Sequence, residues 1–221
     1  MHGAAIASKK TAVLAPLLPL STISPLILGS GSPRRREILA RAGVPFVVVV
    51  GDASEDVLPG EAAGDYLARV VLAKLEAVRA RVEFRAGRVI LVADTSVVEG
   101  GSILGKPASG EEALSMIVRL SGRTHEVMTR FALGAAEGAG EPLVARTVVT
   151  RVTFRAINAE DARAYAAGGE GRDKAGGYAI QGGAARFVDR IEGSHSNVVG
   201  LPEEEVLAAL RRRGLFSPVT P

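Results

Sequence analysis

The 221-residue sequence contains no cysteine, so disulfides, thiolate zinc sites and a cysteine nucleophile are excluded. Its three histidines, His2, His125 and His195, have none of the paired spacings that a histidine-based zinc site uses. Aromatic residues make up only 4% of the chain, which argues against a nucleic-acid binder that stacks bases on an aromatic-rich basic face. A serine hydrolase is also disfavoured, because the G-x-S-x-G nucleophile elbow is missing.

The sequence also has no apolar run long enough for a membrane helix, which needs ~20 residues. Near the N-terminus, Lys9 and Lys10 precede the apolar residues 11–20, an order that imitates a signal peptide. Pro16 and Pro19 interrupt this stretch, and no Ala-x-Ala cleavage site follows it. We therefore expect a cytoplasmic protein without a membrane partner.

The composition is that of an ordinary globular chain, with 47% apolar residues, 23% charged residues and a net charge of +3 from 27 basic and 24 acidic residues. Strand and helix periodicities alternate along it, which predicts an α/β fold. We expect a poorly ordered extension over residues 1–24, one two-lobed domain over 25–213 and a tail over 214–221. The predicted strands cover 26–28, 46–50, 89–93, 124–133, 147–157, 187–191 and 197–199, with a hairpin over 97–104 and helices over 33–42, 61–82, 109–120, 158–168 and from 202 onward.

A glycine and serine loop leads from the first predicted strand into a basic helix, in the order Gly29-Ser30-Gly31-Ser32-Pro33-Arg34-Arg35-Arg36. Free backbone N–H groups at a helix start attract anions. Three arginines in the first turn have the wrong charge for the positive end of a helix dipole, and a bound anion would offset that cost. We favour a phosphate-binding site here over the alternative, a basic helix start exposed to water.

Asp94 follows the apolar run Ile90-Leu91-Val92-Ala93, at the predicted end of a strand. Open α/β sheets place catalytic groups at such ends. An aspartate there can hold a divalent ion or take a proton from water. The alternative is an aspartate that only starts a turn.

Two isolated lysines are candidate phosphate contacts. Lys74 lies in the apolar stripe of the helix predicted over 61–82, where it either points into a polar site or extends its ammonium group to water. Lys106 completes a G-x-x-x-x-G-K match that starts at Gly100. We reject a P-loop, because Pro107 replaces the hydroxyl residue that binds magnesium and a hairpin precedes the motif.

An anion cradle, an acidic residue and isolated lysines favour a substrate with several phosphates. Six blocks of the sequence resemble, in the same order, those of the Maf family of nucleoside triphosphate pyrophosphatases, and they span residues 26 to about 212. The blocks are LGSGSPRR at 28–35, ADT at 93–95, GKP at 105–107, LSGRTH at 120–125, DKAGGYAIQG at 173–182 and VVGLP at 198–202.

The resemblance implies a two-lobed α/β fold related to that of inosine triphosphate pyrophosphatases, with a mixed sheet, flanking helices, a central cleft and often a homodimer. It implies hydrolysis of a nucleoside triphosphate between its α and β phosphates, giving a monophosphate and pyrophosphate, with Mg²⁺ or Mn²⁺ as cofactor. Asp94 would be the general base that activates water, and Asp94 and Glu55 would hold the metal. The implied phosphate contacts are Ser30, Ser32, Arg34, Arg35, Lys74 and Lys106.

Three positions set base preference in the family, and here they are Arg34, Thr95 and Gln181. They match the branch that uses dTTP and UTP. An amide offers both a donor and an acceptor, which suits the O4 and N3–H edge of uracil or thymine. The alternatives are another base, such as 7-methyl-GTP, and a nucleotide-binding regulator of septum formation. No nucleic-acid partner is expected.

Overall fold

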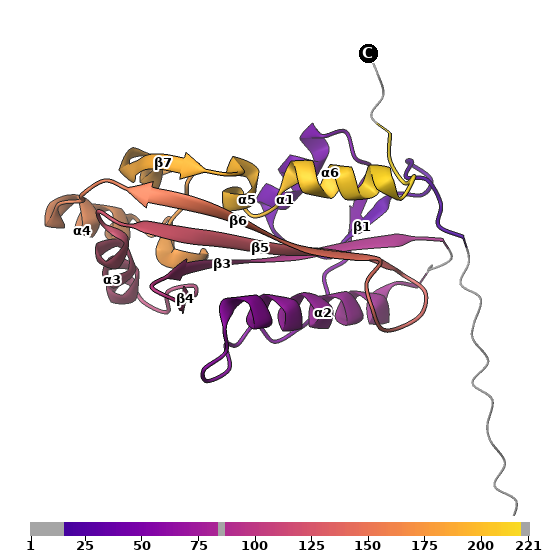
Figure 1. The fold of residues 1–221 in the computed structure, drawn as a ribbon, viewed down its shortest axis with the longest axis horizontal. Coiled ribbons are helices and arrows are strands. Elements are labelled where there is room, and N and C mark those ends of the chain that lie inside the picture. The colour runs from indigo at the N-terminus through magenta and orange to yellow at the C-terminus, as the bar shows by residue number, and fades with distance from the viewer. Residues whose placement is uncertain (1–15, 84–86, 218–221) are drawn as a thin grey trace, which may run out of the picture.

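The computed structural model describes residues 16–83 and 87–217. This part of the chain forms a seven-stranded mixed sheet in the order β2-β1-β3-β5-β6-β7, with β4 paired to β3. Helices cover both faces of the sheet (Figure 1), which confirms the predicted α/β fold with a mixed sheet and flanking helices. The strands are β1 (Leu26–Leu28), β2 (Phe46–Val48), β3 (Val89–Glu99), β4 (Ser102–Leu104), β5 (Thr124–Ala135), β6 (Val144–Phe154) and β7 (Val188–Glu192). The helices are α1 (Pro33–Arg41), α2 (Ala63–Arg81), α3 (Gly110–Leu120), α4 (Ala159–Gly168), α5 (His195–Val199) and α6 (Glu203–Arg212), with 3₁₀ turns η1 (Ala175–Gly177) and η2 (Gly183–Phe187).

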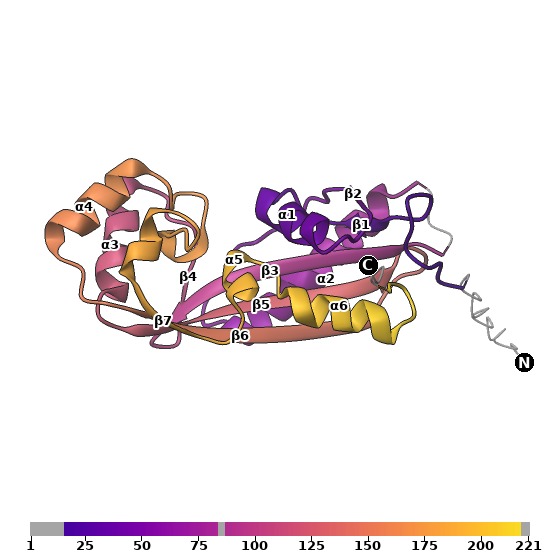
Figure 2. The same ribbon diagram turned by 90° about the horizontal axis from the view of Figure 1, so that it is seen from above.

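The long strands β3, β5 and β6 run through two lobes, as Figure 2 shows. One lobe gathers β1, β2, α1 and α6 at one end of these strands, and the other gathers β4, β7, α3 and α4 at the opposite end. Strands of 11 and 12 residues are long enough to belong to both lobes. The lobes therefore share one continuous sheet.

The two faces of β3 contact different helices. Ile90 and Val92 are buried in one cluster with apolar residues of α2. Leu91 is buried on the other face, in the larger cluster that includes residues of α1 and α6. Because side chains alternate along a strand, Asp94 lies on the α2 face and Thr95 on the opposite face.

The sheet has a gap along one edge of β3. On that edge β1 pairs with Ile90 and Leu91, and β4 pairs with Val97 to Glu99. Among the described strands, residues 92–96 therefore have a neighbour only on the other edge, where β5 pairs with β3 from Val89 to Val98. The middle of this central strand therefore has one edge that no described strand covers.

The predicted end of the third strand at Asp94 is wrong. Strand β3 continues without a break to Glu99, and Asp94 lies at its centre opposite Arg130 of β5. A polar side chain is tolerated there because Lys74 of α2 pairs with it, with 2.6 Å between Nζ and Oδ1. An apolar run followed by Asp-Thr marks a strand end only if no partner strand extends beyond it.

The strand predicted over 197–199 is also wrong, because these residues belong to α5. Ser194 caps this helix, since its Oγ accepts a hydrogen bond from the Asn197 N–H at 3.2 Å. The Asn197 amide donates to the Val127 carbonyl at 2.9 Å. Two adjacent valines are too short a pattern to distinguish a buried strand from a buried turn of helix.

Both ends of the chain fall partly outside the described residues. Of the predicted extension, residues 1–15 lie outside them, whereas Leu20 donates its backbone N–H to the Leu215 carbonyl at 2.7 Å. Leu215, in the predicted tail, is buried in the core, and residues 218–221 lie outside the described residues. Among the described helices, none is long and apolar enough to cross a membrane.

His125 is buried among the aromatic rings of Phe154 and Tyr178, and its Nε2 lies 2.8 Å from the Tyr178 hydroxyl. Burial lowers the pKa of His125 to about 4. In the unfolded chain the imidazole of His125 takes up a proton near pH 6.5. The stability that comes from burying the neutral ring is therefore fully present above that pH and is lost as the pH falls toward 4.

We therefore expect the free energy of unfolding to decrease between pH 7 and pH 5. By pH 4 the decrease that His125 causes reaches about 3 kcal/mol. Urea titrations of the wild type and of His125→Gln at both pH values measure this. The variant should lose much less stability between the two pH values. His195→Gln, at an exposed histidine, is the matched control. An equal pH dependence in wild type and His125→Gln would contradict the assignment.

Candidate functional site

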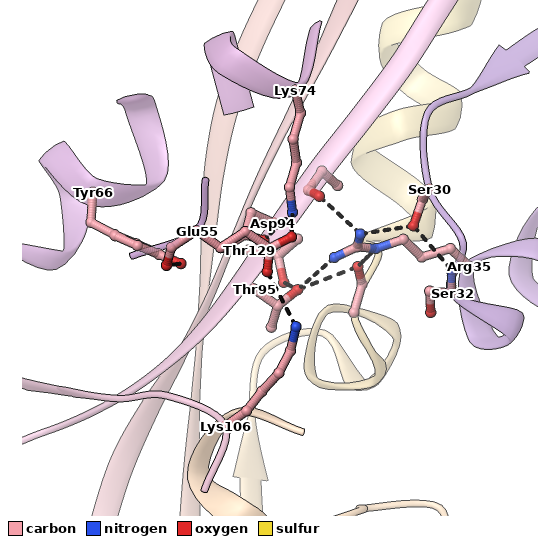
Figure 3. A network of polar contacts seen from close by, with 12 residues as sticks. Ser30, Ser32, Arg35, Glu55, Tyr66, Lys74, Asp94, Thr95, Lys106 and Thr129 are labelled. Carbon is pink, nitrogen blue, oxygen red and sulfur yellow. Dashed lines mark hydrogen bonds and ion pairs between the residues drawn. The ribbon is translucent and has the colours of Figure 1, made fainter. Parts of the chain in front are cut away.

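A cleft of about 640 Å³ opens at the gap beside residues 92–96 of β3. Its walls come from the β1–α1 loop, α2, β3, the segment after β4 and the segment around η1 and η2, so both lobes contribute. Figure 3 shows its polar centre. All the residues that the sequence singled out line this cleft: Ser30, Ser32, Arg34, Arg35, Glu55, Lys74, Asp94, Thr95, Lys106 and Gln181.

The loop before α1 lies close against β3. A Cβ atom at Gly29 would come within 2.7 Å of the side chains of Val78 and Val92, so only glycine allows this approach. Ser30 Oγ accepts a hydrogen bond from the Ser32 N–H at 3.3 Å. Ser32 occupies the predicted N-cap position but makes no capping hydrogen bond, which leaves its hydroxyl available to a ligand.

Arg35 is buried and binds four groups of the protein (Figure 3). Nε donates to the Gly200 carbonyl at 2.8 Å, and Nη1 donates to the Ala93 carbonyl at 2.8 Å and to Ser30 Oγ at 3.0 Å. Nη2 donates to Thr95 Oγ1 at 3.3 Å. Burial lowers the pKa of Arg35, and the nearby carboxylates of Asp94 and Glu55 oppose that shift. Arg35 thus ties α1, β3 and the end of α5 together beneath the cleft.

The other two arginines of the first turn have different surroundings. Arg34 is half-buried and lines the cleft, whereas Arg36 is exposed and does not. Two of the three arginines, Arg34 and Arg35, therefore line the cleft, Arg35 also ties segments of the fold together, and Arg36 lies in water. Arg36 matches the alternative in which the basic helix start is exposed to water, whereas Arg34 and Arg35 do not.

Four charged side chains form a continuous network across the cleft. Lys74 Nζ lies 2.6 Å from Asp94 Oδ1 and 2.8 Å from Glu55 Oε1. Lys106 Nζ lies 3.2 Å from Glu55 Oε2. The Lys74 side chain is only 14% exposed, so its ammonium group points into the polar site and does not extend to water. Burial raises the pKa of Glu55, but its hydrogen bonds and attraction to Lys74 and Lys106 outweigh this and hold it below the usual value.

Sequence analysis missed Tyr66, which also lines the cleft. Its hydroxyl donates to the Glu55 backbone carbonyl at 3.1 Å and so holds the loop that carries Glu55. Burial and the negative charges of Asp94 and Glu55 raise the pKa of Tyr66, which keeps the phenol protonated. The sequence contains a signal for it, because Tyr66 precedes Lys74 by eight residues, two turns along the same helix face.

Gln181 is exposed at the rim of the cleft, and its side chain makes no hydrogen bond within the described residues. The backbone beside it is fixed. Glu170 accepts from the Gly183 N–H with both carboxylate oxygens, at 3.1 and 3.0 Å. Tyr165 accepts from the Ala179 N–H at 2.9 Å. The amide of Gln181 can therefore rotate on a fixed backbone.

Within residues 16–83 and 87–217, no group of three His, Cys, Asp or Glu side chains is placed to hold a metal ion. Two carboxylates, those of Asp94 and Glu55, face one shared cation position, which the Lys74 ammonium takes. Magnesium is commonly bound by one or two carboxylates together with substrate phosphates and water. The residues present fit that type of site.

The family model described as Maf-like protein matches residues 25–213. The chain belongs to this family. A dTTP/UTP pyrophosphatase of Geobacter sulfurreducens is 48% identical over 189 residues, which are 86% of this chain and 96% of that protein. One from Geotalea uraniireducens is 49% identical over 191 residues, with the same coverage. Among solved structures, a dITP/XTP pyrophosphatase of Mycobacterium abscessus matches at 14% identity with a TM-score of 0.38, over 59% of this Maf-like chain and 72% of that chain, which is too weak a likeness for any conclusion.

Proposed function

We propose that this chain hydrolyses nucleoside triphosphates, preferentially dTTP and UTP, to the monophosphate and pyrophosphate. The observation that carries the proposal is that one cleft brings together the Asp94 carboxylate, two lysines and a helix start that presents the Ser32 hydroxyl. Phosphoryl chemistry depends mainly on positioning and on neutralising charge, and this cleft offers both. The sequence identity of 48% and 49% to two dTTP/UTP pyrophosphatases supports pyrimidine nucleoside triphosphates as the substrate class.

The phosphates are assigned to the α1 side of the cleft. Ser30, Ser32 and Arg34 present hydroxyl and guanidinium groups next to the first turn of α1, where backbone N–H groups and the helix dipole favour anions. Lys106 approaches from the other lobe. Four donor contacts of Arg35 are already made within the protein, so its contribution is positive charge and the placement of Ser30.

Asp94 is the general base in this proposal. It accepts a proton from water as the water oxygen attacks the α-phosphorus, and the bond from that phosphorus to the bridging oxygen breaks to release pyrophosphate. Lys74 orients the carboxylate through the 2.6 Å contact to Oδ1. The buried position of Asp94, at 6% exposure, removes competing bulk water and strengthens its electrostatic interactions.

Asp94 and Glu55 would also hold a divalent cation, Mg²⁺ or Mn²⁺, together with phosphate oxygens. When bound, such an ion supplies positive charge that stabilises the negative charge developing on the phosphates. The lowered pKa of Glu55 keeps this carboxylate charged and able to act as a ligand.

Gln181→Glu tests the assignment of base recognition. A carboxylate cannot donate to O4 of uracil or thymine, so we expect kcat/KM for UTP and dTTP to fall by about 10- to 100-fold, the usual cost of a lost or mismatched polar contact. The melting temperature should not change, because Gln181 is exposed and has no protein partner within the described residues. Gln181→Met is the uncharged control of similar length. Unchanged base preference in Gln181→Glu would refute the assignment.

The proposal as a whole is tested by measuring pyrophosphate release with Mg²⁺ or Mn²⁺ from dTTP, UTP, CTP, GTP and 7-methyl-GTP. Selective turnover of dTTP and UTP is the expected result. Turnover of a nucleotide with a different base would support the proposed reaction and overturn the assignment of base preference. Nucleotide binding without any turnover would favour a nucleotide-binding regulator.

A further inference from the structure

Thr95 contacts three protein groups beside the cleft (Figure 3). Its Oγ1 lies 3.3 Å from Arg35 Nη2, 2.9 Å from Thr129 Oγ1 and 3.4 Å from the Gly200 carbonyl. Thr95 lines the cleft, whereas Thr129 is fully buried behind it and does not. Thr129 stands directly opposite Thr95 in the pairing of β3 with β5.

The hydroxyl protons of this pair can be assigned from their partners. Thr129 Oγ1 lies 3.0 Å from the Asn197 carbonyl, which can only accept, so Thr129 donates there. Thr129 has a single proton, and its oxygen must therefore accept the proton of Thr95 across the 2.9 Å contact. The Gly200 carbonyl lies 3.4 Å away and already accepts from Arg35 Nε at 2.8 Å, so it is the weaker acceptor for the Thr95 proton.

As a result, the Thr95 hydroxyl has a fixed polarity: toward a ligand it can accept a hydrogen bond but cannot donate one. Arg35 can only donate, so it takes one lone pair of Thr95 Oγ1. With its proton given to Thr129, Thr95 offers a ligand one remaining lone pair and no donor. A threonine hydroxyl that could rotate freely would offer either.

Gln181 provides no such fixed polarity. Its amide has no protein partner within the described residues, so a half-turn about its last bond exchanges donor and acceptor at little cost. The O4 and N3–H edge of uracil and the amino and N3 edge of cytosine have opposite polarity, and a rotating amide can match both. Discrimination between these bases requires a group that cannot invert.

We propose that Thr129 is a positioning residue for base selection: it fixes Thr95 as an acceptor, which favours bases with an N3–H donor, uracil and thymine, over cytosine. This inference rests on the proposed function and extends it to a buried residue that does not touch the substrate. Thr129 acts by accepting the hydroxyl proton of Thr95, and Arg35 donates to one of the two lone pairs of Thr95 Oγ1.

The test compares kcat/KM for UTP and CTP in the wild type, Thr129→Val and Thr129→Ser. Valine keeps the shape of threonine but cannot accept the Thr95 proton, which then becomes available to cytosine N3. The UTP-to-CTP ratio should fall at least about tenfold in Thr129→Val. Thr129→Ser restores the hydroxyl and should keep the ratio within about twofold of the wild type. In a Thr95→Val background, Thr129→Val should have no further effect on the ratio, because the Thr95 hydroxyl through which Thr129 acts is missing.

An unchanged ratio in Thr129→Val, or an equal further drop in the Thr95→Val background, would overturn the inference. A purely structural role would lower turnover of both nucleotides alike and leave their ratio unchanged. If Thr129→Val does not fold, as judged from its melting curve, the same comparison is made with Thr129→Ala. Failure of the wild type to hydrolyse UTP and dTTP would instead contradict the proposed function, so the two failures are distinguishable.

Discussion

Asp94→Asn is expected to retain nucleotide binding while losing roughly three orders of magnitude in turnover, a typical contribution for a general base. Asparagine keeps the size of the side chain and an oxygen that can accept from Lys74, but it cannot take a proton from water. Lys74 retains Glu55 as a counter-charge at 2.8 Å, so the fold should be little affected. Single-turnover release of pyrophosphate, alongside calorimetric titration with UTP, measures both properties.

Asp65→Asn provides a matched control, because Asp65 is an exposed aspartate in the first turn of α2, outside the cleft. Its turnover should equal that of the wild type. If Asp94→Asn turned over UTP at the wild-type rate, Asp94 could not be the base. If it lost binding together with turnover, the carboxylate would serve mainly to hold the substrate.

Lys74→Met should have the second-largest effect, on stability as well as on turnover. Methionine preserves the apolar stem within the helix stripe but leaves Asp94 and Glu55 without the ammonium group between them. Removing one partner of a buried pair typically costs about 3 kcal/mol. Turnover should fall at least about tenfold, because Asp94 loses the contact that orients it.

Added Mg²⁺ should raise the melting temperature of Lys74→Met more than that of the wild type, since the cation can occupy the position that the ammonium group held. Lys106→Met is the comparison, because Lys106 is 60% exposed and its ion pair within the described residues is with Glu55, at 3.2 Å. Its destabilisation should be below about 1 kcal/mol, as for exposed ion pairs. Equal stability losses in the two variants, or equal responses to Mg²⁺, would contradict the placement of Lys74 at the cation position.

The local features of the fold could be predicted because each depends on residues close together in the chain. The alternation of strand and helix patterns predicted the α/β class, and the loop from Gly29 to Pro33 predicted the start of α1. Two predictions failed where local patterns are ambiguous: the strand ending at Asp94 and the strand over 197–199. In both, the outcome depends on contacts with β5, which are strand pairing for β3 and a side-chain hydrogen bond from Asn197 for α5.

By itself, the sequence determined the fold class, the family and most of the charged side chains of the cleft, although not Tyr66, because motif order and apolar periodicity are properties of the chain. Only the tertiary structure decided how those side chains interact. The register of β3 with β1, β4 and β5 opens the gap at residues 92–96 and sets Thr129 behind Thr95. The packing of α2 turns Lys74 toward Asp94, and the position of Arg35 beneath the cleft lets it bind the Gly200 carbonyl. Each of these depends on contacts between segments remote in sequence, and a local pattern carries no information about register or packing.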